Sequence, residues 1–418
     1  MIMEKKKKPE IRFEGFTDDW EQRKLGIINT FFTDGNYGEA YPKASDMTDS
    51  SSGIPFLTGG NLKEGKLSLD GVSYITPEKH SQLISGHLLE DDIVIAVRGS
   101  LGALGYVNTD NSGWNINSQL AILRTDKSEL YGKFLIQYLL SWAGQNELLK
   151  RQTGSALKQL PIGALKDVEV PITSVAEQER IATYFDSLDH LITLHQRKYE
   201  KLKNVKKSML EKMFPSKGCK VPEIRFSGFT DDWEQRKLGE LAEIVGGGTP
   251  STSVESYWDG DIDWYAPAEI GEQIYLKSSQ RKITEEGLNK SSAKVLPVGT
   301  VLFTSRAGIG KIAILLKEGC TNQGFQSIVP NKDKLDSYFI FTRSEELKRY
   351  GETVGAGSTF VEVSGKQMAN MELMMPTTML EQKKIGAYFC TLDHLITLHQ
   401  RELEKLKNIK KTLLEKMF

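Results

Sequence analysis

Cysteine is scarce in this sequence. The 418 residues include three cysteines, Cys219, Cys320 and Cys390, and no two of them form a C-x-x-C pair. An odd number of widely spaced cysteines is not the pattern of a disulfide framework or of a zinc site, and it is typical of proteins in a reducing compartment. The sequence therefore predicts a cytoplasmic protein without structural disulfides.

Long hydrophobic runs and an excess of one charge are also missing. No apolar stretch approaches the roughly 18 residues that a membrane-spanning helix needs. The basic start, MIMEKKKKPE, is not followed by the apolar segment of a secretory signal. Lys and Arg number 54 and Asp and Glu number 55, so the formal net charge is −1. We expect no membrane contact, and the charge balance neither indicates nor excludes a nucleic-acid partner.

Motifs that carry catalytic chemistry are absent as a set. The sequence has no HExxH, no GxSxG and no Asn/Asp-Pro-Pro-Tyr/Phe motif of the kind that methylates adenine. RAGIGK, from Arg306 to Lys311, resembles part of a phosphate-binding loop. However, Ser305 stands where the first glycine belongs and Ile312 stands where serine or threonine belongs. We expect no catalytic site, no cofactor and no bound metal.

The sequence does contain an internal repeat. EIRFEGFTDDWEQRKLG at residues 10–26 returns as EIRFSGFTDDWEQRKLG at residues 223–239, with 16 of 17 positions identical. We call these two segments the lead-ins. A second pair of similar segments covers residues 188–214 and 392–418, each beginning LDHLITLHQR. Constant parts therefore bracket two variable segments, residues 27–176 and 240–380, which predicts two related halves.

The variable segments have mixed α/β patterning. Short β-branched runs that end at glycines, Ile93–Val97 and Val301–Thr304, predict strands. The apolar spacing from Asp126 to Gln145 predicts a helix that is closed by Gly144. In the first lead-in, Asp18 to Glu21 has capping-box character, so a short helix that ends at Gly26 is expected there. Each variable segment is expected to form a mixed α/β domain with a twisted sheet.

Two positions show kinship between the variable segments. Arg98-Gly99 corresponds to Arg306-Ala307, and Gly154-Ser155 corresponds to Gly357-Ser358. Both pairs fall where a glycine-containing turn is expected, so the two segments are predicted to be related although they differ in length and in most of their sequence.

The long repeats have the apolar spacing of a coiled coil. Apolar residues follow in steps of three and four along residues 177–214 and 381–418, and Gly386 is the only glycine or proline in either segment. The expected seam residues are Ile181, Phe185, Leu188, Ile192 and Leu202 in the first segment, and Ile385, Phe389, Leu392, Ile396 and Leu406 in the second. His195 and His399 also fall in the seam, where we expect them to set the register rather than to bind metal.

A helix of this length needs a partner, and the chain contains its own. Thirty-eight helical residues make a rod of about 57 Å. We expect the two segments to form a long antiparallel two-helix coiled coil. Such pairing would place Phe418 within the roughly 30 Å of Glu10 that nine extended residues can span.

The expected organisation has six parts. They are residues 1–26 (leader and first lead-in), 27–176 (first variable segment), 177–214 (central long helix), 215–239 (linker and second lead-in), 240–380 (second variable segment) and 381–418 (C-terminal long helix).

On these motifs the sequence resembles the specificity subunits of type I restriction–modification systems. The shared residues are Arg12-Phe13, Gly15-Phe16, Trp20 and Lys24–Gly26 in the lead-in, and Pro171, Glu177-Gln178, Leu188-Asp189 and Met213-Phe214 in the helical block, each repeated in the second half. The second variable segment adds GGGTPSTSVESYWDGDIDWY, residues 246–265, where the first has the unlike FFTDGNYGEAYPKASDM, residues 31–47. The resemblance covers essentially the whole chain.

The resemblance implies a fold and a function. The fold class would be α/β, with two pseudo-symmetric target-recognition domains separated by the coiled coil. Each domain would recognise one half of a split site on double-stranded DNA, and the helices would act as a spacer ruler. The helices would also dock two methyltransferase subunits, through which restriction subunits join. The chain itself would have no enzymatic activity.

Two other classes of function remain open at this point. A coiled-coil adaptor that joins two protein-binding domains without DNA is the alternative, and the near-neutral charge supports it. A self-contained methylating or cleaving enzyme would need donor-binding motifs, which the sequence lacks.

Candidate DNA contacts are polar residues in turns of the variable segments. Arginine can contact phosphate or bind guanine through two hydrogen bonds, and amide, hydroxyl and ammonium groups can reach bases or phosphates. The candidates are Arg98, Asn117, Gln119, Ser155 and Lys158 in the first variable segment, and Arg306, Lys311, Asn322, Gln323, Ser358 and Thr359 in the second. The alternatives are salt bridges for the arginines and turn-stabilising hydroxyls for the serines and threonine. We expect Trp20 and Trp233 to anchor the lead-ins rather than to stack on bases.

Overall fold

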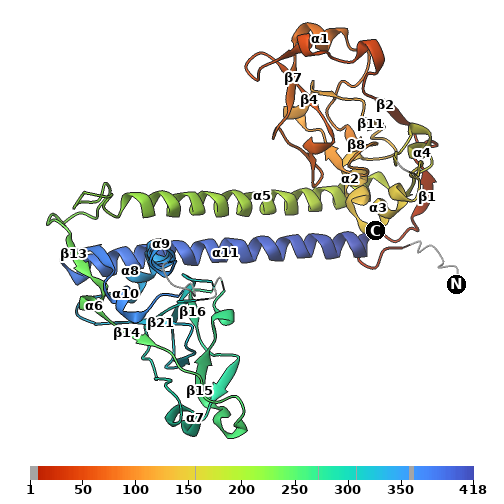
Figure 1. Ribbon diagram of the computed structural model, residues 1–418. Coiled ribbons are helices and arrows are strands. Elements are labelled where there is room, and N and C mark those ends of the chain that lie inside the picture. The colour runs from red at the N-terminus through yellow and green to blue at the C-terminus, as the bar shows by residue number, and fades with distance from the viewer. Residues whose placement is uncertain (1–7, 156, 272, 307, 357–361) are drawn as a thin grey trace. The chain divides into compact units, whose positions relative to one another are not determined.

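The computed structural model describes residues 8–155, 157–271, 273–306, 308–356 and 362–418. The chain forms two compact units: Met1–Gln196 with Arg401–Phe418, and Arg197–Gln400. Each unit contains one lead-in, one variable segment and parts of both long helices (Figure 1).

The elements of the first half of the chain precede and include the first long helix. In order they are β1 (Glu21–Lys24), β2 (Thr30–Asp34), β3 (Met47–Thr48), β4 (Ile54–Leu57), β5 (Leu62–Lys63), β6 (Lys66–Leu67), β7 (Ser73–Ile75), α1 (Pro77–Gln82), β8 (Ile93–Ala96), β9 (Leu104–Tyr106), β10 (Asn115–Ile116), β11 (Leu120–Thr125), α2 (Gly132–Leu140), α3 (Trp142–Leu149), α4 (Ile162–Lys166), β12 (Glu169–Ile172) and α5 (Val175–Lys212).

The second half follows the same plan. Its elements are β13 (Glu234–Lys237), α6 (Leu238–Leu241), β14 (Ala242–Gly246), β15 (Trp258–Tyr265), β16 (Tyr275–Leu276), β17 (Arg281–Ile283), α7 (Glu285–Asn289), β18 (Val301–Phe303), β19 (Ile312–Leu315), β20 (Cys320–Thr321), β21 (Gln326–Pro330), α8 (Ser337–Thr342), α9 (Ser344–Gly355), α10 (Gly365–Ala369), β22 (Glu372–Met375) and α11 (Met379–Met417).

A sheet with completely buried strands forms the centre of each variable segment, with β8 buried in the first and β18 and β19 buried in the second. The strand order is β2-β11-β8-β9 in the first unit and β14-β21-β18-β19-β16 in the second. Ile93 and Ile95 of β8 pack into the core that also contains α2, and Val94 packs on the opposite side of the sheet. Since successive side chains of a strand point to opposite faces, both faces of the strand are covered. The two expected strands and the α/β fold class are confirmed.

The lead-ins form strands, so the expected helix in the first lead-in is wrong. β1 pairs antiparallel with β12, with Glu21 opposite Ile172, and β13 pairs with β22 in the same way. The capping-box pattern was outweighed by backbone hydrogen bonds to a strand that lies almost 150 residues further along the chain. Local propensity is a weak guide where such long-range pairing is available.

The helix expected over residues 126–145 is interrupted. α2 ends at Leu140, and Ser141 caps a new helix, α3, by accepting a hydrogen bond from the Gly144 backbone N–H through its hydroxyl (3.1 Å). Gly144 therefore lies in the first turn of α3 instead of closing α2. A Cβ at Gly144 would lie 2.1 Å from the Tyr138 carbonyl oxygen, which explains the glycine.

The two long helices pair antiparallel in each unit. In the first unit, Leu414 and Met417 near the end of α11 share a core with Phe185 and Leu188 near the start of α5. In the second unit, Met213, just after the end of α5, shares a core with Phe389, near the start of α11. The expected antiparallel coiled coil is confirmed.

The predicted seam residues differ in their burial. The buried ones are Ile181, Phe185, Leu188, Ile385, Phe389 and Leu392, and the half-buried ones are Ile192, Leu202, Ile396 and Leu406. His195 and His399 are half-buried as well. The strongest burial thus occurs where the helices also contact the variable segments.

The N-terminal lead-in contacts the end of the chain within the first unit. The backbone N–H groups of Glu10 and Ile11 both donate to the Lys416 carbonyl oxygen, at 2.9 and 3.1 Å. The corresponding contact in the second unit runs from the Ile224 N–H to the Lys212 oxygen, at 2.9 Å. The expected proximity of Glu10 and Phe418 is confirmed, and the two lead-ins are held in the same manner.

The Phe418 ring should be a stability determinant of the first unit alone. Its centroid lies 5.4 Å from that of Phe134, 5.6 Å from Tyr138 and 6.1 Å from Trp20. Because Phe418 is partly exposed, Phe418→Ala should cost about 2 to 3 kcal/mol, less than for a fully buried ring. Hydrogen exchange should show faster opening in the first unit only. Phe214→Ala is the matched control and should loosen only the second unit; uniform loosening by either change would contradict this.

Candidate nucleic-acid interface

A buried carboxylate in the first turn of α5 fixes the first lead-in. Arg12 donates two hydrogen bonds to Glu177, from Nε to Oε1 (2.6 Å) and from Nη2 to Oε2 (2.7 Å). Trp20 Nε1 donates to the same carboxylate (3.2 Å), and so does the Thr173 hydroxyl. The hydrogen bond to Glu177 raises the pKa of Arg12. The helix N-terminus also favours the negative charge.

The second lead-in is fixed in the same way. Arg225 donates from Nε and Nη2 to Glu381 at 2.7 and 2.9 Å, and Trp233 Nε1 donates to Oε1 at 3.4 Å. The hydrogen bond to Glu381 raises the pKa of Arg225. Trp20 and Trp233 are 7% and 1% exposed, so the expectation that they anchor the lead-ins is confirmed.

Glu177→Gln should destabilise the first unit by about 3 kcal/mol, because it leaves the partly buried Arg12 charge without its counter-charge. Thermal or denaturant unfolding of the full chain measures the loss. Glu179→Gln changes an exposed carboxylate two residues further along the helix and should have little effect on stability. Equal stability of the two variants would contradict the assigned role of Glu177.

Arg98 lies at the end of β8 on the surface of the first variable segment. Its backbone N–H donates to the Gln119 carbonyl (3.2 Å), and its Nη1 donates to the Ser118 carbonyl (3.4 Å). Its Nε donates to Gln159 Oε1 (3.4 Å), and its guanidinium lies 5.3 Å from the Tyr37 ring centroid. These contacts are long and made to uncharged groups, so they leave the arginine charge available at the surface.

Arg306 occupies the equivalent place in the second variable segment. The Ser305 N–H donates to the Gly324 carbonyl (2.8 Å), as the Val97 N–H donates to that of Gln119 (2.9 Å). Arg306 pairs with Glu362 in an isolated β-bridge, as Arg98 pairs with Gln159. The correspondence of the two arginines therefore extends to their backbone partners. Arg306 is half-buried.

Asn117 and Asn322 are equivalent turn residues beneath these arginines. Asn117 Oδ1 accepts from the Gln119 N–H (3.0 Å), and Asn322 Oδ1 accepts from the Gly324 N–H (2.8 Å). Asn117 is 4% exposed, whereas Gln119 is exposed. Between Asn117 and Gln119, it is therefore the Gln119 side chain that is presented at the surface.

Close backbone approach explains two glycines at this turn that the sequence alone did not single out. A Cβ at Gly35 would lie 2.2 Å from the Asn117 carbonyl oxygen, and one at Gly247 would lie 1.9 Å from that of Asn322. The shared packing shows that Gly35, in the stretch 31–47, and Gly247, in the unlike stretch 246–265, occupy equivalent structural positions.

Ser155 and Lys158 lie in an exposed hairpin beside Arg98. Thr153 and Gln159 exchange backbone hydrogen bonds of 2.9 and 3.0 Å across its base, and Gln159 also bridges to Arg98. Leu157 in the same hairpin is 87% exposed, a position that no sequence pattern indicated. The hairpin thereby joins Arg98 and Gln119 at one edge of the first variable segment.

In the second variable segment the candidates are more dispersed. Gln323 is exposed and accepts a hydrogen bond from the Thr249 hydroxyl. Lys311 is exposed at the start of β19, where its N–H donates to Thr304 Oγ1 (3.0 Å). Ser358 and Thr359 lie outside the described residues. Contact of any of these residues with DNA stays a prediction.

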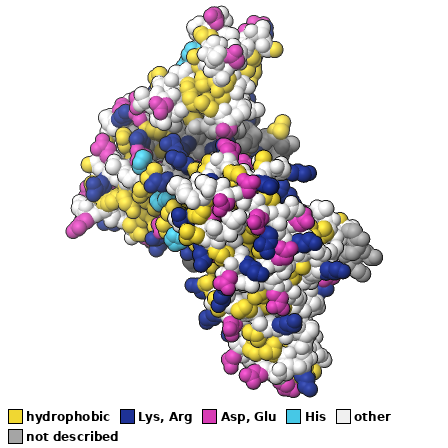
Figure 2. Space-filling model, turned by 90° about the vertical axis from the view of Figure 1, so that its left-hand side faces the viewer, with side chains coloured by type: hydrophobic (Ala, Val, Ile, Leu, Met, Phe, Trp, Pro, Cys, Tyr) yellow, Lys and Arg dark blue, Asp and Glu magenta, His cyan; other side chains and the backbone are white. Residues whose placement is uncertain are grey.

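The surface charge is mixed. In the view of Figure 2, Lys and Arg side chains are interspersed with Asp and Glu, in agreement with the net charge of −1.

Among the described residues, no group of three or more His, Cys, Asp or Glu could hold a metal ion. In the same part of the chain, no helix is long and apolar enough to cross a membrane.

Two related α/β units, each with an anchored lead-in and an arginine in an equivalent turn, define a class of internally duplicated protein. A family model described as "Type I restriction modification DNA specificity domain" matches residues 17–204 and 230–408. The chain therefore belongs to this family, and the resemblance noted in the sequence is confirmed.

Relatives cover part or nearly all of the chain. The type I restriction enzyme MjaIX specificity subunit of Methanocaldococcus jannaschii is 35% identical over 190 residues, which is 45% of this chain and 44% of that protein. The putative MjaX specificity subunit of the same organism is 26% identical over 95% of this chain and 92% of that protein. The chain thus spans less than half of the first relative and most of the second.

A solved structure shares the fold. The S subunit of a type I restriction–modification system from M. genitalium matches with a TM-score of 0.67 and 16% identity, covering 98% of this chain and 99% of that chain. The family model and the named relatives agree, so the chain belongs to the type I restriction–modification specificity family.

Proposed function

We propose that this chain recognises a bipartite site on double-stranded DNA and assembles two methyltransferase subunits, through which restriction subunits join. It would do so in the cytoplasm, where its three free cysteines remain reduced. The observation that supports the proposal best is the equivalence of Arg98 and Arg306. The two arginines follow equivalent strands in two units whose surrounding surfaces differ.

Each variable segment would recognise one half-site. Arg98 lies among Tyr37, Gln119 and the hairpin of residues 153–159, whereas the counterpart turn of Arg306 includes Gln323, which bonds Thr249. Equivalent frameworks with unlike side chains suit two different base sequences, because base edges in the major groove differ in their donors and acceptors. A protein with two identical units would instead suit a palindrome.

The long helices would set the distance between the half-sites. α5 has 38 residues and α11 has 39, so each is a rod of about 57 Å. One turn of the DNA double helix is about 34 Å. Half-sites with several unread base pairs between them match such a rod.

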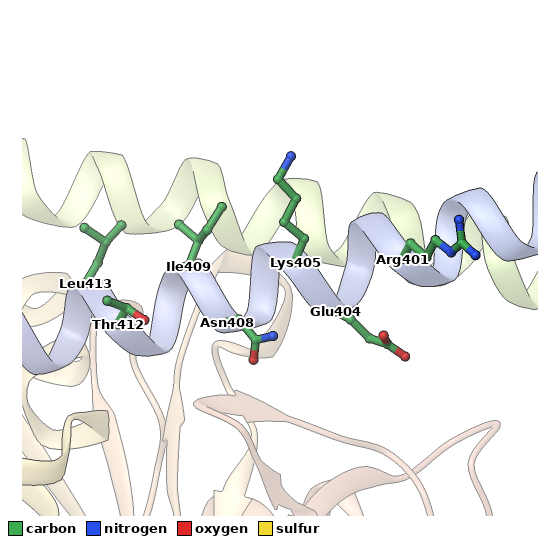
Figure 3. Close-up of a pocket in the computed structure, with 7 residues that line it drawn as sticks. All are labelled: Arg401, Glu404, Lys405, Asn408, Ile409, Thr412 and Leu413. Atoms are coloured by element: carbon green, nitrogen blue, oxygen red, sulfur yellow. The ribbon is translucent and has the colours of Figure 1, made fainter. Parts of the chain in front are cut away.

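A shallow groove on α11 supports the docking of partners (Figure 3). The side chains that line it follow one another over successive turns and are Arg401, Glu404, Lys405, Asn408, Ile409, Thr412 and Leu413. The same pattern occurs on α5 as Arg197, Glu200, Lys201, Asn204, Val205, Ser208 and Met209. One sequence pattern present on both long helices suits two copies of one partner. The partners would also supply positively charged side chains for the DNA phosphates, because this chain has no excess of positive charge.

Arginine substitutions test recognition of each half-site. In the complex with methyltransferase subunits, Arg98→Ala should weaken DNA binding about 5- to 150-fold and relax sequence preference in one half-site, because a bidentate arginine contact contributes about 1–3 kcal/mol. Arg306→Ala should do the same in the other half-site. Competition binding with half-site variants gives both readouts.

Arg349→Ala is the control, since this exposed arginine lies on α9 and its Nε donates to the backbone oxygen of Glu345. It should leave DNA binding unchanged. Absence of sequence-specific binding by the wild-type complex would favour the protein-binding adaptor instead.

Exchange of a variable segment tests the proposed domain boundaries. Replacing residues 240–380 with the corresponding segment of another family member should change one half of the methylated site and leave the other half and the spacer unaltered. Sequencing of modified host DNA measures the result. A change in both halves would show that the two segments do not act as separate recognition domains.

A further inference from the structure

A carboxylate in the second unit joins three elements. Asp393 of α11 is buried, and its Oδ1 accepts from Lys206 Nζ of α5 at 2.5 Å. Its Oδ2 accepts from the Tyr338 hydroxyl of α8 at 2.9 Å. Burial raises the pKa of Tyr338 most, and the charge of Asp393 raises it further. The hydroxyl therefore stays protonated and acts as a donor. One side chain thus connects both long helices and the second variable segment; we call Asp393, Lys206 and Tyr338 the second junction.

The first unit has the same arrangement with the helices exchanged. Asp189 of α5 accepts from Lys410 Nζ of α11, at 2.7 Å to Oδ1 and 2.8 Å to Oδ2. Gln137 Nε2 of α2, in the first variable segment, donates to Asp189 Oδ2 at 3.3 Å. Asp189, Lys410 and Gln137 form the first junction.

The two junctions agree on one helix register. In an antiparallel pair, residues that face each other have numbers with a constant total, and the numbers of both the Lys206–Asp393 pair and the Asp189–Lys410 pair add up to 599. The apolar seam alone would tolerate a slip of one heptad, which is about 10 Å, because leucine-rich layers resemble one another. A partly buried ion pair opposes such a slip, since the slip would leave a charge without its partner.

We propose that Asp189 and Asp393 are positioning residues that set which DNA spacer length the protein accepts. This inference rests on the bipartite recognition proposed above. Each carboxylate fixes the register of the helices and, through its other hydrogen bond, fixes a variable segment to that same helix turn. A change in register or in the seating of a variable segment would therefore alter the distance between the two DNA-contacting edges.

Spacer discrimination is the readout. The complex of the full chain with its methyltransferase subunits would methylate DNA that carries both half-sites with the natural spacer or with one base pair more or less. The ratio of rates for natural and altered spacers does not depend on the fraction of active protein. Lys206→Met and Tyr338→Phe should each lower this ratio roughly tenfold, as loss of one charge-assisted hydrogen bond would.

Two controls separate positioning from general stability. Lys206→Arg retains the ion pair and should keep the wild-type ratio. Arg236→Met removes the exposed Arg236–Glu240 pair of the same unit and should also keep it. Should Lys206→Met fail to assemble, Tyr338→Phe decides, because it removes one hydroxyl and leaves the Lys206–Asp393 pair in place.

The outcomes distinguish this inference from the proposed function. If the wild-type complex discriminates spacers and Tyr338→Phe keeps the full ratio, the positioning role is overturned while bipartite recognition stands. If the wild-type complex accepts all spacers equally, bipartite recognition with a fixed distance fails, and the positioning role fails with it.

Discussion

The carboxylates of Glu177 and Glu381 are the interactions on which the rest of the structure depends. Each sits in the first turn of a long helix and binds an arginine and a tryptophan of a lead-in. The lead-in in turn pairs with the strand just before the helix. One ionic contact thereby joins the start of each half to the helix that ends it. This explains why the lead-in is repeated with a single difference in 17 positions.

Constant and variable parts have separate physical tasks. The repeated parts provide the anchor, the antiparallel helix contacts and the two Asp–Lys junctions, all of which occur once in each unit. The variable segments keep a common buried strand and a common glycine–asparagine turn, and they differ in what surrounds these at the surface. Recognition can therefore change without change in the framework that holds it.

Much of the fold followed from sequence, because the repeat, the 3- and 4-residue apolar steps and the β-branched runs are local signals. The strand at β1 was missed since its partner, β12, lies far along the chain, and the break at Ser141 was missed since capping competes with apolar spacing. At the candidate site, the structural correspondence of Arg98 and Arg306 was predictable from the aligned turns of the two variable segments. The burial of Asn117 and the exposure of Leu157 required the packed structure, as did the junctions, whose members lie up to 221 residues apart.

A genome-wide map of modified adenines in host DNA, with and without this gene, tests the central claim most directly. Two unlike, anchored recognition units on one pair of helices predict that deletion of the gene removes methylation from a single asymmetric motif, in two parts separated by a constant number of unspecified base pairs. Loss of a continuous or palindromic motif, or no loss at all, would contradict the account.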